Sequence, residues 1–126
     1  MARRIGILAL QGAFREHARA LERCGAETRE IRAQADLDNL DGVVLPGGES
    51  TVMGRLLAEE GLMQPLRELC LSGVPVLGTC AGMMLMAEKL PDYPDQPRLG
   101  IMDISVMRNA FGRQADSFTT RIEVRE

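Results

Sequence analysis

The feature of the sequence best suited to covalent chemistry is a cysteine flanked on both sides by glycine. Cys80 lies in Gly78-Thr79-Cys80-Ala81-Gly82, with a glycine two positions before it and another two positions after it. This spacing matches the elbow turn that lifts a nucleophile above a sheet, between a strand and a helix. The N–H groups that open the helix favour a thiolate and can hold an oxyanion. We therefore predict that Cys80 is a nucleophile rather than a small buried hydrophobic residue.

A second turn, Leu45-Pro46-Gly47-Gly48-Glu49-Ser50, has paired glycines that would let a ligand approach backbone N–H groups closely. Two interpretations stay open. The turn could complete an oxyanion hole next to Cys80, or it could be an ordinary strand-to-helix turn with Ser50 as the N-cap. A phosphate site is disfavoured, because the G-x-x-x-x-G-K-[ST] spacing and its lysine are missing.

The other chemically capable residues favour structural roles. His17 is the only histidine, and we expect it to pack at the edge of the core, so it is not assigned as a catalytic base. Cys24 and Cys70 lie on predicted apolar helix faces and are expected to be buried thiols. Three charged residues in a polar segment near the end of the chain are either solvated or substrate-binding: Arg108, Arg113 and Asp116.

Strands and helices are expected to alternate along the chain. We expect strands at residues 5–10, 27–32, 42–45, 74–77, 101–107 and 118–124, and helices at residues 13–24, 50–60, 63–71 and 83–90. Residues 36–40 form a short helix or turn in this interpretation. The alternation predicts one α/β domain over residues 1–126, with a doubly wound, mostly parallel sheet and helices on both faces.

The predicted order of elements places the chemical groups together. Gln11-Gly12, the Gly47-Gly48 turn and the Cys80 turn each follow the carboxyl end of a predicted strand. Ligands of such folds bind beyond the carboxyl ends of the strands. The three turns are therefore expected to converge on one edge of the sheet and to form one site there.

Composition excludes several classes of function. The 126 residues are 45% hydrophobic and carry a net charge of -3, which gives no basic field for nucleic acid. No apolar run approaches the ~18 residues needed to cross a bilayer, and no signal peptide is evident. Three widely spaced cysteines form no disulfide framework and no zinc motif. We expect a cytoplasmic protein without a metal or an organic cofactor.

Four segments, taken together and in this order, resemble the glutaminase subunits of pyridoxal 5'-phosphate synthases, which are class I glutamine amidotransferases with a flavodoxin-like three-layer fold. The segments are residues 9–17 (ALQGAFREH), 45–51 (LPGGEST), 78–83 (GTCAGM) and 108–114 (RNAFGRQ). The glycine-flanked cysteine alone indicates a glutamine amidotransferase or a neighbouring cysteine hydrolase. The first and last segments are more specific to this subunit.

The resemblance implies a reaction and a set of roles. Cys80 would attack the side-chain amide of glutamine and form a glutamyl thioester, which water converts to glutamate, while the ammonia travels to a separate synthase subunit. Backbone N–H groups of Gly48 and Ala81 would form the oxyanion hole. Glutamine would be contacted by Gly48, Glu49 and Ser50, and Arg108 would hold its α-amino acid end. Gln11 would lie near the nucleophile and the partner interface.

The sequence departs from this family in one respect. The family carries a His-x-Glu pair near the C-terminus, which activates the cysteine, and no histidine follows Cys80 in this chain. We therefore interpret the sequence as the N-terminal two thirds of the family's domain, with C-terminal elements missing, and expect negligible turnover from these residues alone. A non-catalytic module that binds the partner, or another cysteine hydrolase of related fold, are the alternatives.

Overall fold

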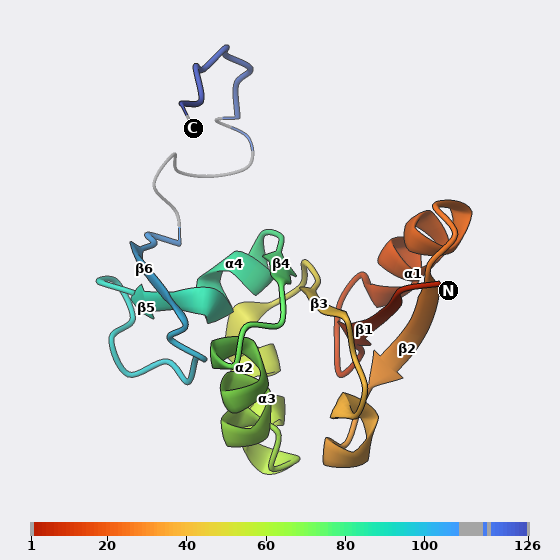
Figure 1. Cartoon of the computed structure of the whole chain (residues 1–126). Coiled ribbons are helices and arrows are strands. Elements are labelled where there is room, and N and C mark those ends of the chain that lie inside the picture. Colours follow the sequence, from red (N-terminus) through yellow and green to blue (C-terminus); the bar gives the residue numbers. More distant parts are fainter. Residues whose placement is uncertain (1, 109–114, 116, 126) are drawn as a thin grey trace.

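The computed structural model describes residues 2–108, 115 and 117–125, and its centre is a four-stranded parallel sheet. The strands are β1 (Arg4–Leu8), β2 (Glu27–Ile31), β3 (Gly42–Leu45) and β4 (Val76–Gly78). Their order across the sheet is β2-β1-β3-β4, and every neighbouring pair is parallel. All four residues of β3 are buried, as expected for a central strand of a parallel sheet, whereas β2 at one edge is mostly polar and buries only Ile31. The predicted α/β fold with a parallel sheet is confirmed (Figure 1).

The helices pack on both faces of this sheet. They are α1 (Phe14–Arg23), α2 (Ser50–Glu59), α3 (Met63–Leu71) and α4 (Ala81–Met86), with a short 3-10 turn at Gln34–Leu37. One buried cluster joins Leu45 of β3 to Leu57 of α2 and Leu85 of α4. α1 contacts β1 and β2 but contributes no residue to that cluster, so it lies on the opposite face. None of the helices described is both long and apolar enough to cross a lipid bilayer.

A second, smaller sheet stands beside the main one. Its strands are β5 (Ala87–Lys89) and β6 (Met102–Ser105), which pair in parallel. The sequence predicted one helix over residues 83–90, and this prediction is wrong beyond Met86. The carbonyl groups of Leu85 and Met86 accept hydrogen bonds from residues 99–101, where the chain returns. These bonds replace the next helical turn, and the chain continues as β5.

The final predicted strand is also absent. Residues 117–125 adopt no regular secondary structure, although residues 118–124 were predicted as a strand. Ile122 and Val124 are exposed to 75% and 85%. Apolar residues at alternate positions form a strand only where a partner strand completes the hydrogen bonds and a core receives the side chains. Figure 1 shows this segment apart from both sheets.

Candidate active site

Three turns meet at the carboxyl edge of the parallel sheet. The carbonyl of Gly47, after β3, accepts a hydrogen bond of 2.9 Å from the N–H of Ala13, after β1. The N–H of Thr79, after β4, donates to the carbonyl of Leu45 at 3.1 Å. A Cβ atom added to Gly47 would lie 3.5 Å from the Cβ of Cys80. The predicted convergence of the three turns is therefore confirmed by their backbone contacts.

Cys80 occupies a strained and exposed position at this edge. Its backbone has φ 52° and ψ −113°, a conformation that residues with a side chain rarely adopt and that costs ~1–3 kcal/mol. The residue is exposed and directly precedes α4. A Cβ added to Gly82 would collide with the carbonyl of Leu45, so the helix can approach β3 only because position 82 is glycine. The elbow geometry that the glycine spacing predicted is present.

Gln11 is held against the Gly47-Gly48 turn. Its side-chain Oε1 accepts a hydrogen bond of 3.0 Å from the backbone N–H of Glu49. A Cβ added to Gly48 would lie 2.5 Å from the same oxygen, so a side chain there would displace Gln11. Gly48 is exposed, so a ligand can reach its backbone. The structure thus brings together Gln11, Gly48 and Glu49, which are three of the predicted site residues.

The N-cap of α2 is Glu49, not Ser50 as the sequence pattern allowed. Glu49 has an extended backbone, and its carboxylate oxygens accept hydrogen bonds from the N–H groups of Thr51 at 3.0 Å and Val52 at 3.1 Å. The Thr51 N–H, with smaller contributions from Val52 and Arg108, lowers the pKa of the Glu49 carboxyl against the opposing effect of burial. Ser50 is buried instead, and its hydroxyl bonds to no described residue.

Arg108 lies beside Glu49, although 58 residues separate the two along the chain. Its Nη2 is 3.4 Å from Glu49 Oε1, and its guanidinium lies 4.4 Å from the centre of the Tyr93 ring. Sequence reasoning missed Tyr93, whose only signal was that it is the single tyrosine and stands among prolines. The other two charged candidates of this segment, Arg113 and Asp116, lie outside the described residues.

His17 has a partner that the sequence did not indicate. Its Nε2 lies 3.3 Å from the Oγ1 of Thr79, the residue before Cys80. The half-buried position agrees with the expected place at the edge of the core. Within the described part of the chain, no hydrogen bond joins His17 to Cys80. The histidine therefore links α1 to Thr79, the residue that precedes Cys80 in the elbow.

The three cysteines differ in their surroundings. Cys24 was expected to be buried, but it follows the last turn of α1 and is exposed. The prediction failed because α1 ends at Arg23, which leaves Cys24 beyond the apolar face. Cys70 packs against the main core, and burial raises the pKa of its thiol to about 11. Cys80 alone is exposed at the meeting point of the turns.

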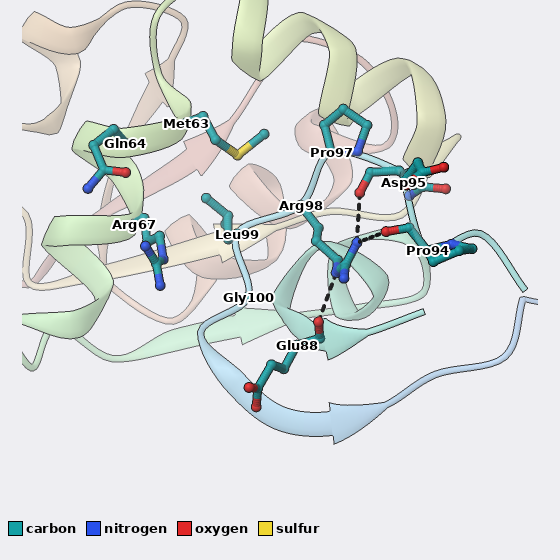
Figure 2. A pocket seen from close by; sticks show the side chains of 11 residues that line it. Met63, Gln64, Arg67, Glu88, Pro94, Asp95, Pro97, Arg98, Leu99 and Gly100 are labelled. Carbon is teal, nitrogen blue, oxygen red and sulfur yellow. Dashed lines mark hydrogen bonds between the residues drawn. The ribbon is translucent and has the colours of Figure 1, made fainter. Parts of the chain in front are cut away.

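A separate hollow of about 490 Å³ lies between the start of α3, Glu88 and the segment 94–100. Figure 2 shows Arg98 inside its wall, donating to backbone carbonyls rather than pointing to solvent. None of the predicted site residues lines this hollow. It is distinct from the edge that carries Cys80.

Residues 7–126 match the SNO glutamine amidotransferase family. The chain belongs to this family. The matched residues include all three turns of the candidate site, and therefore Cys80 and Gly48, and they also include Arg108.

Two similar curated proteins carry the same name. The chain is 55% identical over 98% of its length to the pyridoxal 5'-phosphate synthase subunit PdxT of Carboxydothermus hydrogenoformans. It is 56% identical over 96% of its length to the subunit of the same name from Frankia alni. These matches cover 64% and 61% of the two relatives. The chain thus spans less than two thirds of their length.

Solved structures agree with the fold of the SNO family. A crystal structure of a glutamine amidotransferase superposes with a TM-score of 0.84 at 47% identity, covering 90% of this chain and 61% of that one. A peptidase E-like protein from Listeria monocytogenes superposes with a TM-score of 0.69 at 14% identity. The second likeness concerns the fold alone.

Proposed function

We propose that this protein is a glutaminase that hydrolyses the side-chain amide of L-glutamine, with Cys80 as the nucleophile. The observation that carries the proposal is the exposed, strained Cys80 at the elbow, facing the Gly47-Gly48 turn. Membership of the SNO glutamine amidotransferase family supports the same chemistry. A thiol held in this way above a sheet suits nucleophilic attack on an acyl carbon.

The proposed reaction has two halves. The sulfur of Cys80 attacks the amide carbon of glutamine, the C–N bond breaks, and the nitrogen leaves as ammonia after gaining a proton. Water then attacks the thioester, which releases glutamate and restores the thiol. In each half a negative charge develops on the acyl oxygen, and backbone N–H groups stabilise it.

Two N–H groups can serve as the oxyanion donors. Neither the N–H of Gly48 nor that of Ala81 donates a hydrogen bond to any residue that the structure describes. Ala81 is the first residue of α4, where N–H groups have no partner within the helix. We assign both groups to the oxyanion hole, as the resemblance implied.

The reaction also needs a group that accepts the proton of the Cys80 thiol. His17 is engaged with Thr79, so we do not assign it as the general base. The His-x-Glu pair that the resemblance implies does not occur in this sequence, and the base is left unassigned. Cys80 accounts for the nucleophile, and Gly48 and Ala81 account for oxyanion binding.

We further propose that the ammonia passes to a synthase subunit that makes pyridoxal 5'-phosphate. The support is the name that the relatives bear, which describes them as subunits of that synthase. We place the complex in the cytoplasm, which agrees with three cysteines that all remain free thiols.

Ammonia release tests the proposal. The protein as its gene encodes it, mixed with the synthase subunit, should convert glutamine to glutamate and ammonia in equal amounts. Replacing Cys80 by alanine or serine should lower this rate by at least about 10³-fold, because no other described side chain can take the role of the thiol. Cys24→Ser is the matched control and should keep the full rate. A Cys80→Ala protein that retains the rate would refute the proposal.

A further inference from the structure

The aromatic ring of Tyr93 contacts Arg108, which in turn contacts Glu49 at the start of α2. The guanidinium of Arg108 lies over this ring at 4.4 Å, a distance at which the negative face of an aromatic ring attracts a cation. On another side, Nη2 of Arg108 contacts Glu49 Oε1 at 3.4 Å. Arg108 is thus held between an aromatic face and a carboxylate, and only 23% of its side chain is exposed.

The loop that carries Tyr93 is itself well anchored. This Tyr93 loop, residues 91–98, starts with a turn in which the N–H of Tyr93 donates to the carbonyl of Leu90 at 3.0 Å. Arg98 donates to the carbonyls of Glu88, Pro94 and Gln96, each at 3.0 Å, as Figure 2 shows from the side of the hollow. The ring therefore rests on a fixed backbone.

The Tyr93 loop also reaches the start of α2. Gln96 is buried, with 7% of the residue exposed, and its Oε1 accepts a hydrogen bond of 3.4 Å from the hydroxyl of Thr51. Thr51 is also one of the two residues whose N–H groups bind the Glu49 carboxylate. The loop consequently supports both partners of the Arg108–Glu49 ion pair, one through Tyr93 and the other through Gln96.

The Arg108 guanidinium carries five N–H donors. Among the described residues, its one polar contact is with Glu49. An α-amino acid presents a carboxylate and an ammonium group side by side. Arg108 and Glu49 present the opposite charges side by side, 3.4 Å apart, so the pair is complementary in charge to such a zwitterion.

We propose that Tyr93 is a positioning residue for glutamine, because its ring fixes the Arg108 guanidinium in the plane that receives the α-carboxylate. This inference rests on the proposed glutaminase function. The ring face does the positioning and the hydroxyl does not, since the hydroxyl bonds to no residue that the structure describes. Tyr93 acts on the affinity for glutamine and does not touch the reacting atoms at Cys80.

Three substitutions at position 93 distinguish the effect of the aromatic face from the effect of apolar bulk. Tyr93→Phe keeps the aromatic face, Tyr93→Leu keeps apolar bulk without it, and Tyr93→Ala removes both. Measured in the complex with the synthase subunit, the KM for glutamine should rise about five-fold in the leucine and alanine variants, while kcat changes less than about two-fold. The phenylalanine variant should retain most of the affinity. Leu71→Ala, at a distant exposed position, is the control.

A second readout excludes a general loss of structure. Alkylation of Cys80 by iodoacetamide, which has no α-amino acid group, should proceed at the same rate in all variants. Labelling by a glutamine-like diazoketone should slow in the leucine and alanine variants. A Tyr93→Leu protein with unchanged KM and labelling would overturn the role of Tyr93 and leave the glutaminase proposal standing. An unsubstituted complex that releases no ammonia and takes no label would overturn both.

Discussion

The main sheet and the segment of residues 87–108 reach the active-site edge by different kinds of contact. In the main sheet, β1 pairs along its whole length with β2, and the turns that follow β1, β3 and β4 are joined by backbone hydrogen bonds. In residues 87–108, two short strands pair, and side chains such as Arg98 hold the loop between them. The first region places Cys80 and the second places Arg108. The proposed nucleophile and the proposed substrate-binding residue therefore belong to separate parts of the molecule.

The largest effect is expected from overcrowding the elbow. Gly82→Ala would place a methyl group against the carbonyl of Leu45 in β3, so α4 and β3 must move apart. We expect a loss of about 3 kcal/mol in the free energy of unfolding, measured by urea denaturation. Gly25→Ala is the control, because Gly25 has a positive φ but a Cβ there would meet no atom within 4 Å. Its cost should be about 1 kcal/mol. Equal costs would mean that the elbow is not closely packed.

A smaller effect is expected from releasing the loop of the second region. Arg98→Ala would leave the carbonyls of Glu88, Pro94 and Gln96 without their donor. We expect a loss of about 1–2 kcal/mol, together with faster hydrogen exchange at Leu99 and Ile101 and unchanged exchange in β1 and β3. Arg98→Lys should not restore protection, since an ammonium group cannot match the planar donor fork. Uniformly faster exchange across both regions would contradict their independence.

The smallest effect concerns Glu49, where the two regions meet. Its folded pKa lies below the usual value of 4.5, so its contribution to stability is present above pH 4.5 and is lost as pH falls through the folded pKa. Glu49→Gln should cost about 1 kcal/mol at pH 7, and the difference from the unsubstituted protein should vanish under strongly acidic conditions. Glu59→Gln, at the other end of α2, should change stability by less than about 0.5 kcal/mol. Urea midpoints at several pH values measure both. A cost of Glu49→Gln that does not change with pH would mean that the charge is not the stabilising feature.

Elements fixed by local sequence signals could be predicted from the sequence, and elements fixed by contacts with distant residues could not. The bounds of β3 (Gly42–Leu45) and α3 (Met63–Leu71) agree with the prediction to the residue, because apolar spacing and flanking glycines are local signals. The Cys80 elbow was visible for the same reason. The end of α4 was not, because hydrogen bonds from residues 99–101 terminate the helix and no local signal marks them.

Two features of the site depended on contacts that spacing cannot reveal. Glu49 rather than Ser50 caps α2, because its longer side chain reaches two N–H groups while the Ser50 hydroxyl is turned into the core. The stacking of Arg108 on Tyr93 joins residues from two loops, and nothing in the sequence around Tyr93 indicated a partner. The sequence therefore did not predict the role of Tyr93 or the capping role of Glu49, because each depends on contacts that residue spacing does not encode.

The central claim is that Cys80 is the nucleophile of a glutamine site. Its most direct test uses the protein as its gene encodes it, in complex with the synthase subunit. The complex is treated with a glutamine-like diazoketone, and the modified residues are identified by peptide mass analysis. We predict one adduct, on Cys80, which excess glutamine prevents. Exposed Cys24 lacks the surrounding turns, and Cys70 is held as a thiol by a pKa of about 11, so both should stay unmodified. A label on Cys24, or a label on Cys80 that glutamine does not prevent, would contradict the assignment of Cys80 as the nucleophile of a glutamine site.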